Sequence, residues 1–297
     1  MSFLPQWLPQ AQFAGYYMAY EKGFYRQQGI DLMIMRGGPE SPPTDVLSRN
    51  QVNFATMFLS SAIRLRDRGV RIVNIGQVVQ RSGFILVTRK SSGIDSPAGL
   101  NGKKVSLWPD FSLQPRAFFQ KYGVAVQTVP QGATLNLFLR GGVAAASAMW
   151  YNEYHTLLNS GLNDDELKAF FFDKYGLNFP EDGIYCLEET FKRHPDLCGR
   201  FVRASLEGWR YAFANREETL DIVMKQIRDA HVATNRVHQK WMLDKMSDLV
   251  LPKGSKAALG YLDPEDYRRV AGELKRNDLI TATPPYGEFY VNCTAPR

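Results

Sequence analysis

The stretch WLPQAQFAGYYMAYEKGFYRQQGIDL, from Trp7 to Leu32, decides the fold. It follows an apolar run near 2–7, and its aromatic residues recur at spacings of three and four. That spacing predicts a helix near 12–28 whose aromatic face packs mostly in the core. A second β-prone run near 30–35 follows at once. A strand, a helix and another strand in this order are typical of a βαβ unit.

The residues at the start of this helix differ from its aromatic face. Gln10, Gln12 and Phe13 lie at the turn from strand to helix. Side chains and unbonded backbone N–H groups at such a turn can face a ligand. These three residues are therefore the first candidate ligand-binding residues.

The same alternation continues through the first two thirds of the chain and predicts a largely parallel sheet. Further strands are predicted near 52–57, 71–78, 83–88, 103–107, 125–129, 144–149 and 183–187. Further helices are predicted near 42–50, 59–68, 113–122, 133–140 and 151–160. From 187 to 249 the apolar spacing is that of long amphipathic helices, and a last helix begins at Pro264.

Two α/β blocks followed by a helical return predict two lobes joined by more than one crossing of the chain. We expect lobe 1 to comprise 1–88 and 188–297, and lobe 2 to comprise 89–187. Ligands of open α/β sheets bind outside the carboxyl ends of the strands. A cleft between two such lobes is therefore the expected place for a binding site.

The composition excludes several classes of protein. The chain has 297 residues, of which 44% are hydrophobic and 22% charged, as in an ordinary folded protein. No apolar run approaches the ~20 residues of a membrane-spanning helix. The N-terminal stretch MSFLPQWLPQ has no signal-peptide pattern. The formal net charge of +6 is mild, and the basic stretch 64–71 is accompanied by no nucleic-acid motif, so we expect no nucleic-acid partner.

The cysteines give no sign of a metal or redox site. Cys186, Cys198 and Cys293 form no CxxC pair, and their disulfide state is left open by the sequence. We expect neither a metal nor a cofactor.

Two further strand ends of lobe 1 carry candidate ligand contacts. The loop RGGPESPPTDV offers Gly38 and Pro39, where glycine allows close approach of the backbone, although an ordinary turn explains the loop as well. The next strand ends near Met57 and Phe58, which form either an apolar wall of the site or part of the core.

Lobe 2 carries its own candidates. The segment KKVSLWPDF places Trp108 at a strand end and Asp110 two residues later, and an indole face suits stacking on a flat ring. The run GGVAAASAMWYNEYH leads from small residues to Tyr151, Asn152 and Glu153. Glu153 either interacts with the dipole of the helix it begins or accepts hydrogen bonds from N–H groups of a ligand.

A family resemblance rests on six segments of the sequence. They are WLPQAQFAGYYMAYEKGFYRQQGIDL, RGGPE, NFATMFLSSAI, GKKVSLW, AMWYNEYHTLLNSG and PEDGIYCLEE. Together they resemble the periplasmic solute-binding proteins of the thiamine-pyrimidine-precursor, sulfonate and nitrate group, over nearly the whole chain. The resemblance implies an α/β fold of the type II periplasmic-binding-protein kind, with two α/β lobes and a central ligand cleft.

The resemblance also implies a function. Such a protein is expected to be a monomer outside the cytoplasm, with its signal or anchor not in this chain, and to deliver a small-molecule ligand to an ABC permease. In the thiamine-precursor branch a pyrimidine is held between aromatic faces and against acidic and amide groups. Those roles would fall here to Trp108, Tyr151, Asn152 and Glu153, with Asp182 a further candidate. The aromatic surroundings favour a flat nitrogen-containing ligand over a small oxyanion, and a flavin precursor is left open.

Two other functions are alternatives. The stretch HVATNRVHQKWMLDKMSDLVLP, 231–252, resembles the helical region of extracellular sensor domains, whose partner is their own membrane signalling module, a histidine kinase or a cyclase. Some fungal relatives of the fold make the thiamine pyrimidine from their own histidine and pyridoxal phosphate, and they carry a cysteine-rich motif. This chain has no cysteine cluster and no GxSxG, P-loop or HExxH motif, so we expect no enzyme.

Overall fold

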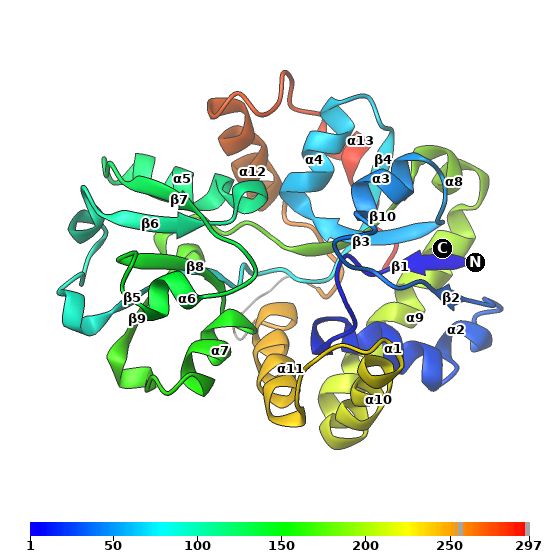
Figure 1. Cartoon of the computed structure of the whole chain (residues 1–297). Coiled ribbons are helices and arrows are strands. Elements are labelled where there is room, and N and C mark those ends of the chain that lie inside the picture. Colours follow the sequence, from blue (N-terminus) through cyan, green and yellow to red (C-terminus); the bar gives the residue numbers. More distant parts are fainter. Residues whose placement is uncertain (253, 255–257, 295–297) are drawn as a thin grey trace. The chain divides into compact units, whose positions relative to one another are not determined.

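A computed structural model describes residues 1–252, 254 and 258–294, and the chain divides into two compact units (Figure 1). Unit 2 is Ser82–Phe179, and unit 1 is formed by Met1–Arg81 together with the chain from Pro180 onward. The predicted boundaries after residues 88 and 187 therefore differ from those of the structure. Residues 82–88 belong to unit 2, and residues 180–187 belong to unit 1.

Unit 1 contains a five-stranded sheet with the strand order β2-β1-β3-β10-β4. The strands are β1 (Ser2–Leu4), β2 (Met33–Ile34), β3 (Phe54–Phe58), β4 (Ile72–Gln77) and β10 (Asp182–Leu187). Strands β2 and β3 pair with β1 in parallel, whereas β10 runs antiparallel to both β3 and β4. The carboxyl ends of β1 and β3 and the first residue of β10 therefore lie at the same edge.

Unit 2 contains a second five-stranded sheet, with the order β7-β6-β8-β5-β9. Its strands are β5 (Phe84–Arg89), β6 (Lys104–Leu107), β7 (Gln127–Pro130), β8 (Ala145–Met149) and β9 (Leu167–Phe171). Strands β7 and β8 are parallel to β6, and β5 is antiparallel to β8 and β9. The ends of β6, β8 and β9 thus lie at the edge where β5 begins.

Both sheets are largely parallel, as predicted, but each contains one antiparallel strand and is therefore mixed. The antiparallel members are β5 and β10, the strands next to the two chain crossings, and both are almost wholly buried. Strands buried on both faces read as continuous apolar runs whatever their direction, so the sequence pattern does not distinguish the two cases. Strand β9 was not predicted at all.

The helices of unit 1 cover most of the remaining chain. They are η1 (Ala11–Phe13), α1 (Ala14–Glu21), α2 (Phe24–Gln27), α3 (Pro43–Ser48), α4 (Leu59–Asp67), α8 (Glu188–Arg193), α9 (Pro195–Ala214), α10 (Arg216–Asp229), α11 (Arg236–Val250), α12 (Pro264–Arg276) and α13 (Tyr286–Phe289). The single helix predicted near 12–28 is divided at Gly23, whose φ of 74° lies in the left-handed region that glycine tolerates.

Unit 2 has shorter helices. They are η2 (Lys90–Ser92), η3 (Pro97–Leu100), η4 (Pro109–Phe111), α5 (Leu113–Lys121), α6 (Asn136–Leu139), α7 (Glu153–Asn159), η5 (Asp164–Glu166) and η6 (Phe172–Tyr175). In the described part of the chain no helix has the length and apolar character needed to cross a bilayer.

Packing of α1 on α9 fixes the start of the first helix. A Cβ atom on Gly15 would lie 2.2 Å from the Trp209 ring, and one on Gly208 would lie 2.1 Å from the carbonyl oxygen of Gly15. Trp209 is fully buried and meets the Tyr16 ring edge-on, with 5.7 Å between ring centroids. This close contact holds α1, and with it η1, against the core.

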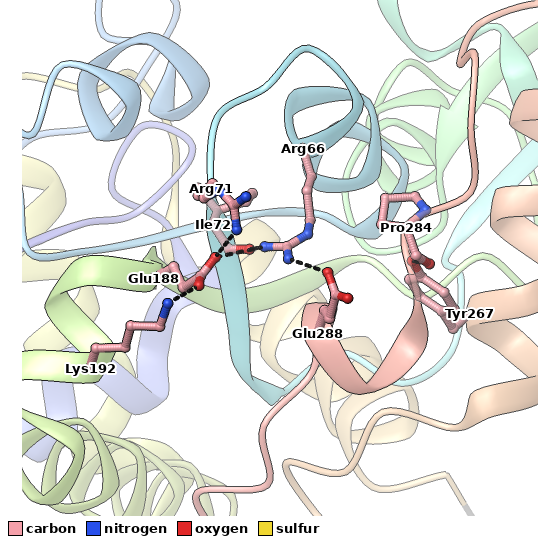
Figure 2. Close-up of polar contacts among 8 residues, drawn as sticks. All are labelled: Arg66, Arg71, Ile72, Glu188, Lys192, Tyr267, Pro284 and Glu288. Carbon is pink, nitrogen blue, oxygen red and sulfur yellow. Dashed lines mark hydrogen bonds and ion pairs between the residues drawn. The ribbon is translucent and has the colours of Figure 1, made fainter.

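An ion cluster ties four elements of unit 1 together (Figure 2). Arg66 of α4 donates to the carbonyl oxygen of Ile72 in β4 at 2.6 Å, and its guanidinium lies 3.8 Å from Glu188 and 3.4 Å from Glu288. Lys192, first, and then Arg71 hold the pKa of Glu188 below its usual value. The side chains of Arg66 and Glu188 are both mostly buried, so this pair fixes α8 to β4 more firmly than an exposed ion pair would, whereas Glu288 of α13 is exposed.

Two buried glutamines hold the segments at which the chain passes between the units. In unit 1, Nε2 of Gln77 donates to the carbonyl oxygens of Val79 and Glu181, each at 3.0 Å. In unit 2, Nε2 of Gln114 donates to the Ser82 hydroxyl at 3.1 Å and to the carbonyl oxygen of Leu177 at 2.7 Å. Each glutamine thus ties the outgoing and returning chain together inside its own unit.

Candidate functional site

A chain of buried polar side chains lies at the edge of the unit 1 sheet. Gln10 and Gln12, on the turn between β1 and α1, are both buried. Nε2 of Gln10 donates to Oε1 of Gln12 at 2.5 Å, and Nε2 of Gln12 donates to Oδ2 of Asp182 at 2.7 Å. The structure therefore brings together three residues that the sequence named separately, from segments 170 positions apart.

Asp182 has an acceptor to spare. Its Oδ1 atom is buried and has no hydrogen-bond partner among the residues that the structure describes. Burial raises the pKa of its carboxyl group to about 7, although the hydrogen bond from Gln12 opposes the rise. An unpaired buried carboxyl oxygen costs free energy. Buried groups of this kind occur most often where a function requires them.

The end of β3 lies beside Asp182. In the register of β3 and β10, Phe58 is opposite Asp182 and Met57 is opposite Gly183. Met57 is buried, whereas Phe58 is partly exposed. Met57 therefore has the character of a core residue, and Phe58 is the one that presents surface at this edge. Phe13 of η1 is fully buried as well.

Close packing explains the two glycines in the loop that contains Gly38. A Cβ atom on Gly37 would lie 2.0 Å from the carbonyl oxygen of Pro5, and one on Gly38 would lie 2.9 Å from the Leu8 side chain. Gly38 also has a φ of 137°. Pro39 is exposed. The loop packs tightly on the segment after β1, which limits the positions open to the turn that carries Gln10.

In unit 2, Glu153 begins α7 directly after β8. Its Oε2 accepts the backbone N–H of Met149 at 2.9 Å, and its Oε1 accepts Nδ2 of Asn152 at 2.8 Å. Burial raises the pKa of Glu153 to about 7, and these hydrogen bonds oppose the rise. The carboxylate thus closes the turn between β8 and α7 and holds the Asn152 side chain.

Aromatic rings gather at the same edge of the unit 2 sheet. Trp108 follows β6 and contacts Phe84 with 5.5 Å between ring centroids, and Trp150 meets Phe171 edge-on at 5.3 Å. Trp108 and Trp150 are both partly exposed, which leaves part of each ring at the surface of the unit. This edge can pack a flat ring.

Two other candidate residues of unit 2 differ in their exposure to solvent. Tyr151 is buried, with an exposed fraction of 2%. Asp110 is exposed on η4. Of the two, Asp110 is the residue that faces solvent.

Sequence reasoning missed two contributors to these edges. Phe171 ends the unpredicted strand β9, and the short apolar run that precedes it could have indicated a strand. Gln239, on α11, accepts the backbone N–H of Ala11 at 2.7 Å. It lies 228 positions from Ala11, and no local pattern marks it.

In the described ranges, no group of three or more His, Cys, Asp or Glu side chains could hold a metal ion. Cys186, Cys198 and Cys293 are all buried in unit 1. Burial, first, and then contact with Cys198 raise the pKa of the Cys186 thiol, which makes it a poor nucleophile.

Comparison with known proteins identifies relatives along most of the chain. A family model described as NMT1/THI5 like matches residues 10–219. Riboflavin-binding protein RibY of Chloroflexus aurantiacus is 23% identical over 98% of this chain and 84% of its own. A formylaminopyrimidine-binding protein of Halalkalibacterium halodurans is 21% identical over 92% and 84%. A 4-amino-5-hydroxymethyl-2-methylpyrimidine phosphate synthase of Saccharomyces cerevisiae is 20% identical over 72% and 67%.

Solved structures agree on the fold. The periplasmic aliphatic sulphonate-binding protein SsuA of Escherichia coli superposes with a TM-score of 0.74, at 13% identity, over 95% of this chain and 94% of its own. The chain therefore has the α/β fold of the type II periplasmic-binding proteins, as the sequence predicted.

Proposed function

Because the chain belongs to the NMT1/THI5-like family, we propose that it is an extracytoplasmic solute-binding protein of an ABC import system. Its ligand in this proposal is a small nitrogen-containing aromatic molecule, such as a thiamine pyrimidine precursor or a flavin. Relatives named for riboflavin and for formylaminopyrimidine support this class of ligand. A permease in the membrane would receive the ligand from the protein, which acts as a monomer.

The single observation that carries the proposal is the spare acceptor on Asp182. Its Oδ1 is buried without a partner in the described structure, while Oδ2 is held by Gln12. A ring N–H or an amino group of the ligand would satisfy Oδ1 through a charge-assisted hydrogen bond. The amide chain from Gln10 through Gln12 fixes the direction in which the carboxyl group faces.

The aromatic edge of unit 2 supplies the second part of the proposal. Trp108 and Trp150 would pack against the face of a flat ring, because both rings are partly exposed. Glu153 and Asn152 hold the turn on which Trp150 and Tyr151 stand. In this proposal Glu153 acts mainly by shaping the turn, and Asp182 is the principal acceptor for the ligand.

A small oxyanion fits these residues less well. Asp182 and Glu153 are carboxyl groups that burial already disfavours as anions, and an anionic ligand beside either one would add repulsion. A neutral or cationic heteroaromatic ligand carries donors and avoids that cost. The proposal therefore sets nitrogen heterocycles above nitrate, sulfonates and phosphate.

A ligand panel tests the proposal. Purified protein would be melted in the presence of formylaminopyrimidine, hydroxymethylpyrimidine, riboflavin, an alkanesulfonate and nitrate. A ligand at 100 times its Kd stabilises the folded state by about 2.7 kcal/mol, which is a clear shift in Tm. We expect a shift with at least one heterocycle and none with nitrate. A shift with the sulfonate alone, or with no compound, would contradict the proposal.

Because one relative is named as a synthase, the ligand panel needs a control for chemical turnover. The yeast relative is named for making a pyrimidine phosphate, so the melted samples would also be analysed for covalent change in ligand and protein. A binding protein returns its ligand unchanged. Chemical conversion of any compound in the panel would contradict the proposal that the protein binds its ligand without catalysing a reaction.

A further inference from the structure

We propose that Gln239 is a positioning residue for the ligand site of unit 1. It acts by holding the backbone of Ala11, which sets the two glutamines on either side of Ala11 in register with Asp182. The inference rests on the proposed function of that site. It adds a residue from α11, an element that lies outside residues 10–219, the range matched by the family model.

The contact itself is buried and directional. Oε1 of Gln239 accepts the N–H of Ala11 at 2.7 Å, and Nε2 of Gln239 donates to Oγ1 of Thr234 at 3.1 Å. Gln239 is 2% exposed. Because the Thr234 hydroxyl accepts the amide N–H, the oxygen of the amide group is the atom that faces Ala11. Neither end of the side chain is left to rotate freely.

Ala11 needs such a partner. It is the first residue of η1, and the N–H groups of a first helical turn have no acceptor inside the helix. Gln10, the N-cap residue, makes no side-chain capping bond there. Its side chain instead donates to Gln12. Gln239 therefore supplies from α11 the cap that the local sequence does not provide.

The position of the Ala11 backbone also affects Asp182. Gln10 and Gln12 flank Ala11, so a shift of the Ala11 backbone moves both side chains of the Gln10–Gln12–Asp182 chain. Tyr16 and Tyr185 also interact electrostatically with Asp182, and burial raises the pKa of both phenols, so both stay protonated near neutral pH. Gln12 is thus the group whose position controls the hydrogen bonding of the Asp182 carboxyl group.

Three variants separate a positioning role from a general loss of packing. Gln239→Met keeps the volume and removes the acceptor for Ala11. Gln239→Glu keeps an acceptor, and the Thr234 hydroxyl can turn to donate to it. Gln131→Met is the matched control, because Gln131 is also buried and bonds to the backbone of Ser147 at 3.0 and 2.7 Å, but in unit 2.

The first readout needs no ligand. Carbon-13 NMR of the carboxyl groups would follow the titration of Asp182 in the ligand-free protein. We expect Gln239→Met to raise the pKa of Asp182 by at least about 0.5, because Gln12 no longer donates steadily to the carboxylate. Gln239→Glu and Gln131→Met should leave that pKa within about 0.2 of the wild-type value. If Gln239→Met does not fold, Thr234→Val replaces it and should shift the pKa in the same direction.

The second readout is affinity for the heterocycle that binds best in the panel. Gln239→Met should weaken it roughly fivefold or more, and Gln239→Glu should restore it to within about twofold. An unchanged Asp182 titration and unchanged affinity in Gln239→Met would overturn the inference, even if Tm falls. If no panel member binds the wild type, the proposed function fails, and the carboxyl titration still decides the role of Gln239.

Discussion

The side chain of Gln12 donates a hydrogen bond of 2.7 Å to Oδ2 of Asp182, a residue 170 positions further along the chain. Gln12 stands on the turn after β1, and Asp182 is the first residue of β10. The bond exists because β10 runs antiparallel beside β3, so that its beginning lies at the edge where β1 and β3 end. One oxygen of Asp182 is thereby fixed, and the other is left for a ligand in our proposal.

The buried carboxyl groups predict an unusual dependence of stability on pH. Burial raises the pKa of Asp182 and of Glu153 to about 7, above the ordinary value near 4 that each has in the unfolded chain. Between these values the folded protein binds more protons than the unfolded one, so the free energy of unfolding falls as pH rises from about 4 to about 7. Each pH unit contributes up to roughly 1.4 kcal/mol per group.

Urea titrations of the ligand-free protein at pH 4.5, 5.5, 6.5 and 7.5 would measure this slope. In Asp182→Asn the share of the decline that comes from Asp182 should vanish, so the variant gains stability relative to the wild type as pH rises. Asp263→Asn, at the partly exposed N-cap of α12, is the comparison variant. Identical pH profiles for the wild type and Asp182→Asn would show that Asp182 titrates normally.

Glu153→Gln should affect folding more than binding. Both oxygens of Glu153 already accept hydrogen bonds, from Met149 and from Asn152, and a glutamine side chain can replace only one acceptor. We expect a loss of about 1 kcal/mol in stability at pH 5.5, where Glu153 is protonated in the folded protein, and a smaller difference at pH 7.5, where ionisation of Glu153 destabilises the wild type. Affinity for the ligand should fall less than about threefold. Chemical denaturation and calorimetric titration give the two numbers. A large loss of affinity at unchanged stability would make Glu153 a direct ligand contact.

Gly37→Ala should destabilise unit 1 strongly. Its new Cβ atom would lie 2.0 Å from the carbonyl oxygen of Pro5, so the backbone of one segment has to move. We expect a loss of about 2 to 4 kcal/mol in the free energy of unfolding. Gly132→Ala is the matched control, since a Cβ there meets nothing within 4 Å. Equal stability of the two variants would show that the loop after β2 can move to accommodate the Cβ atom without a loss in the free energy of unfolding.

Trp108→Ala should weaken ligand binding with a small effect on stability, because the ring is partly exposed and packs on Phe84 alone among the ring contacts described for it. Loss of one stacking face corresponds to about 1 kcal/mol, or roughly fivefold in Kd. Trp108→Phe should recover most of the affinity. If Trp108→Ala binds as the wild type does, the aromatic edge of unit 2 takes no part in recognition.

Much of the fold could be predicted from the sequence, because its strands and helices carry regular apolar spacing. The strands predicted near 52–57, 71–78 and 144–149 are observed as β3, β4 and β8, with ends that differ by a few residues. Strand direction could not be predicted, since β5 and β10 are buried on both faces and show no alternation. The predicted boundaries assign most of β5 to lobe 1 and β10 to lobe 2, because a buried strand beside a crossing carries no signal of which sheet it joins.

Part of the candidate site could be predicted, namely the residues that are marked by their position directly after a strand. The sequence predicts Gln10, Gln12 and Trp108 as site residues because they follow strands, and the structure puts each at a sheet edge. The sequence could not show which of the acidic candidates has a free acceptor for a ligand. Glu153 stands out in sequence, but its carboxylate is engaged within its own turn, whereas the spare acceptor of Asp182 depends on pairing between distant strands. The role of Gln239 depends on tertiary packing alone.

The most direct test of the central claim is calorimetric titration of the wild type and Asp182→Asn with two compounds. One is the heterocycle that binds best in the panel, and the other is its derivative with the N–H donors methylated. We expect the wild type to prefer the N–H compound by roughly tenfold or more, and Asp182→Asn to lose most of this preference. Equal preference in the two proteins would contradict recognition of the ligand by Asp182.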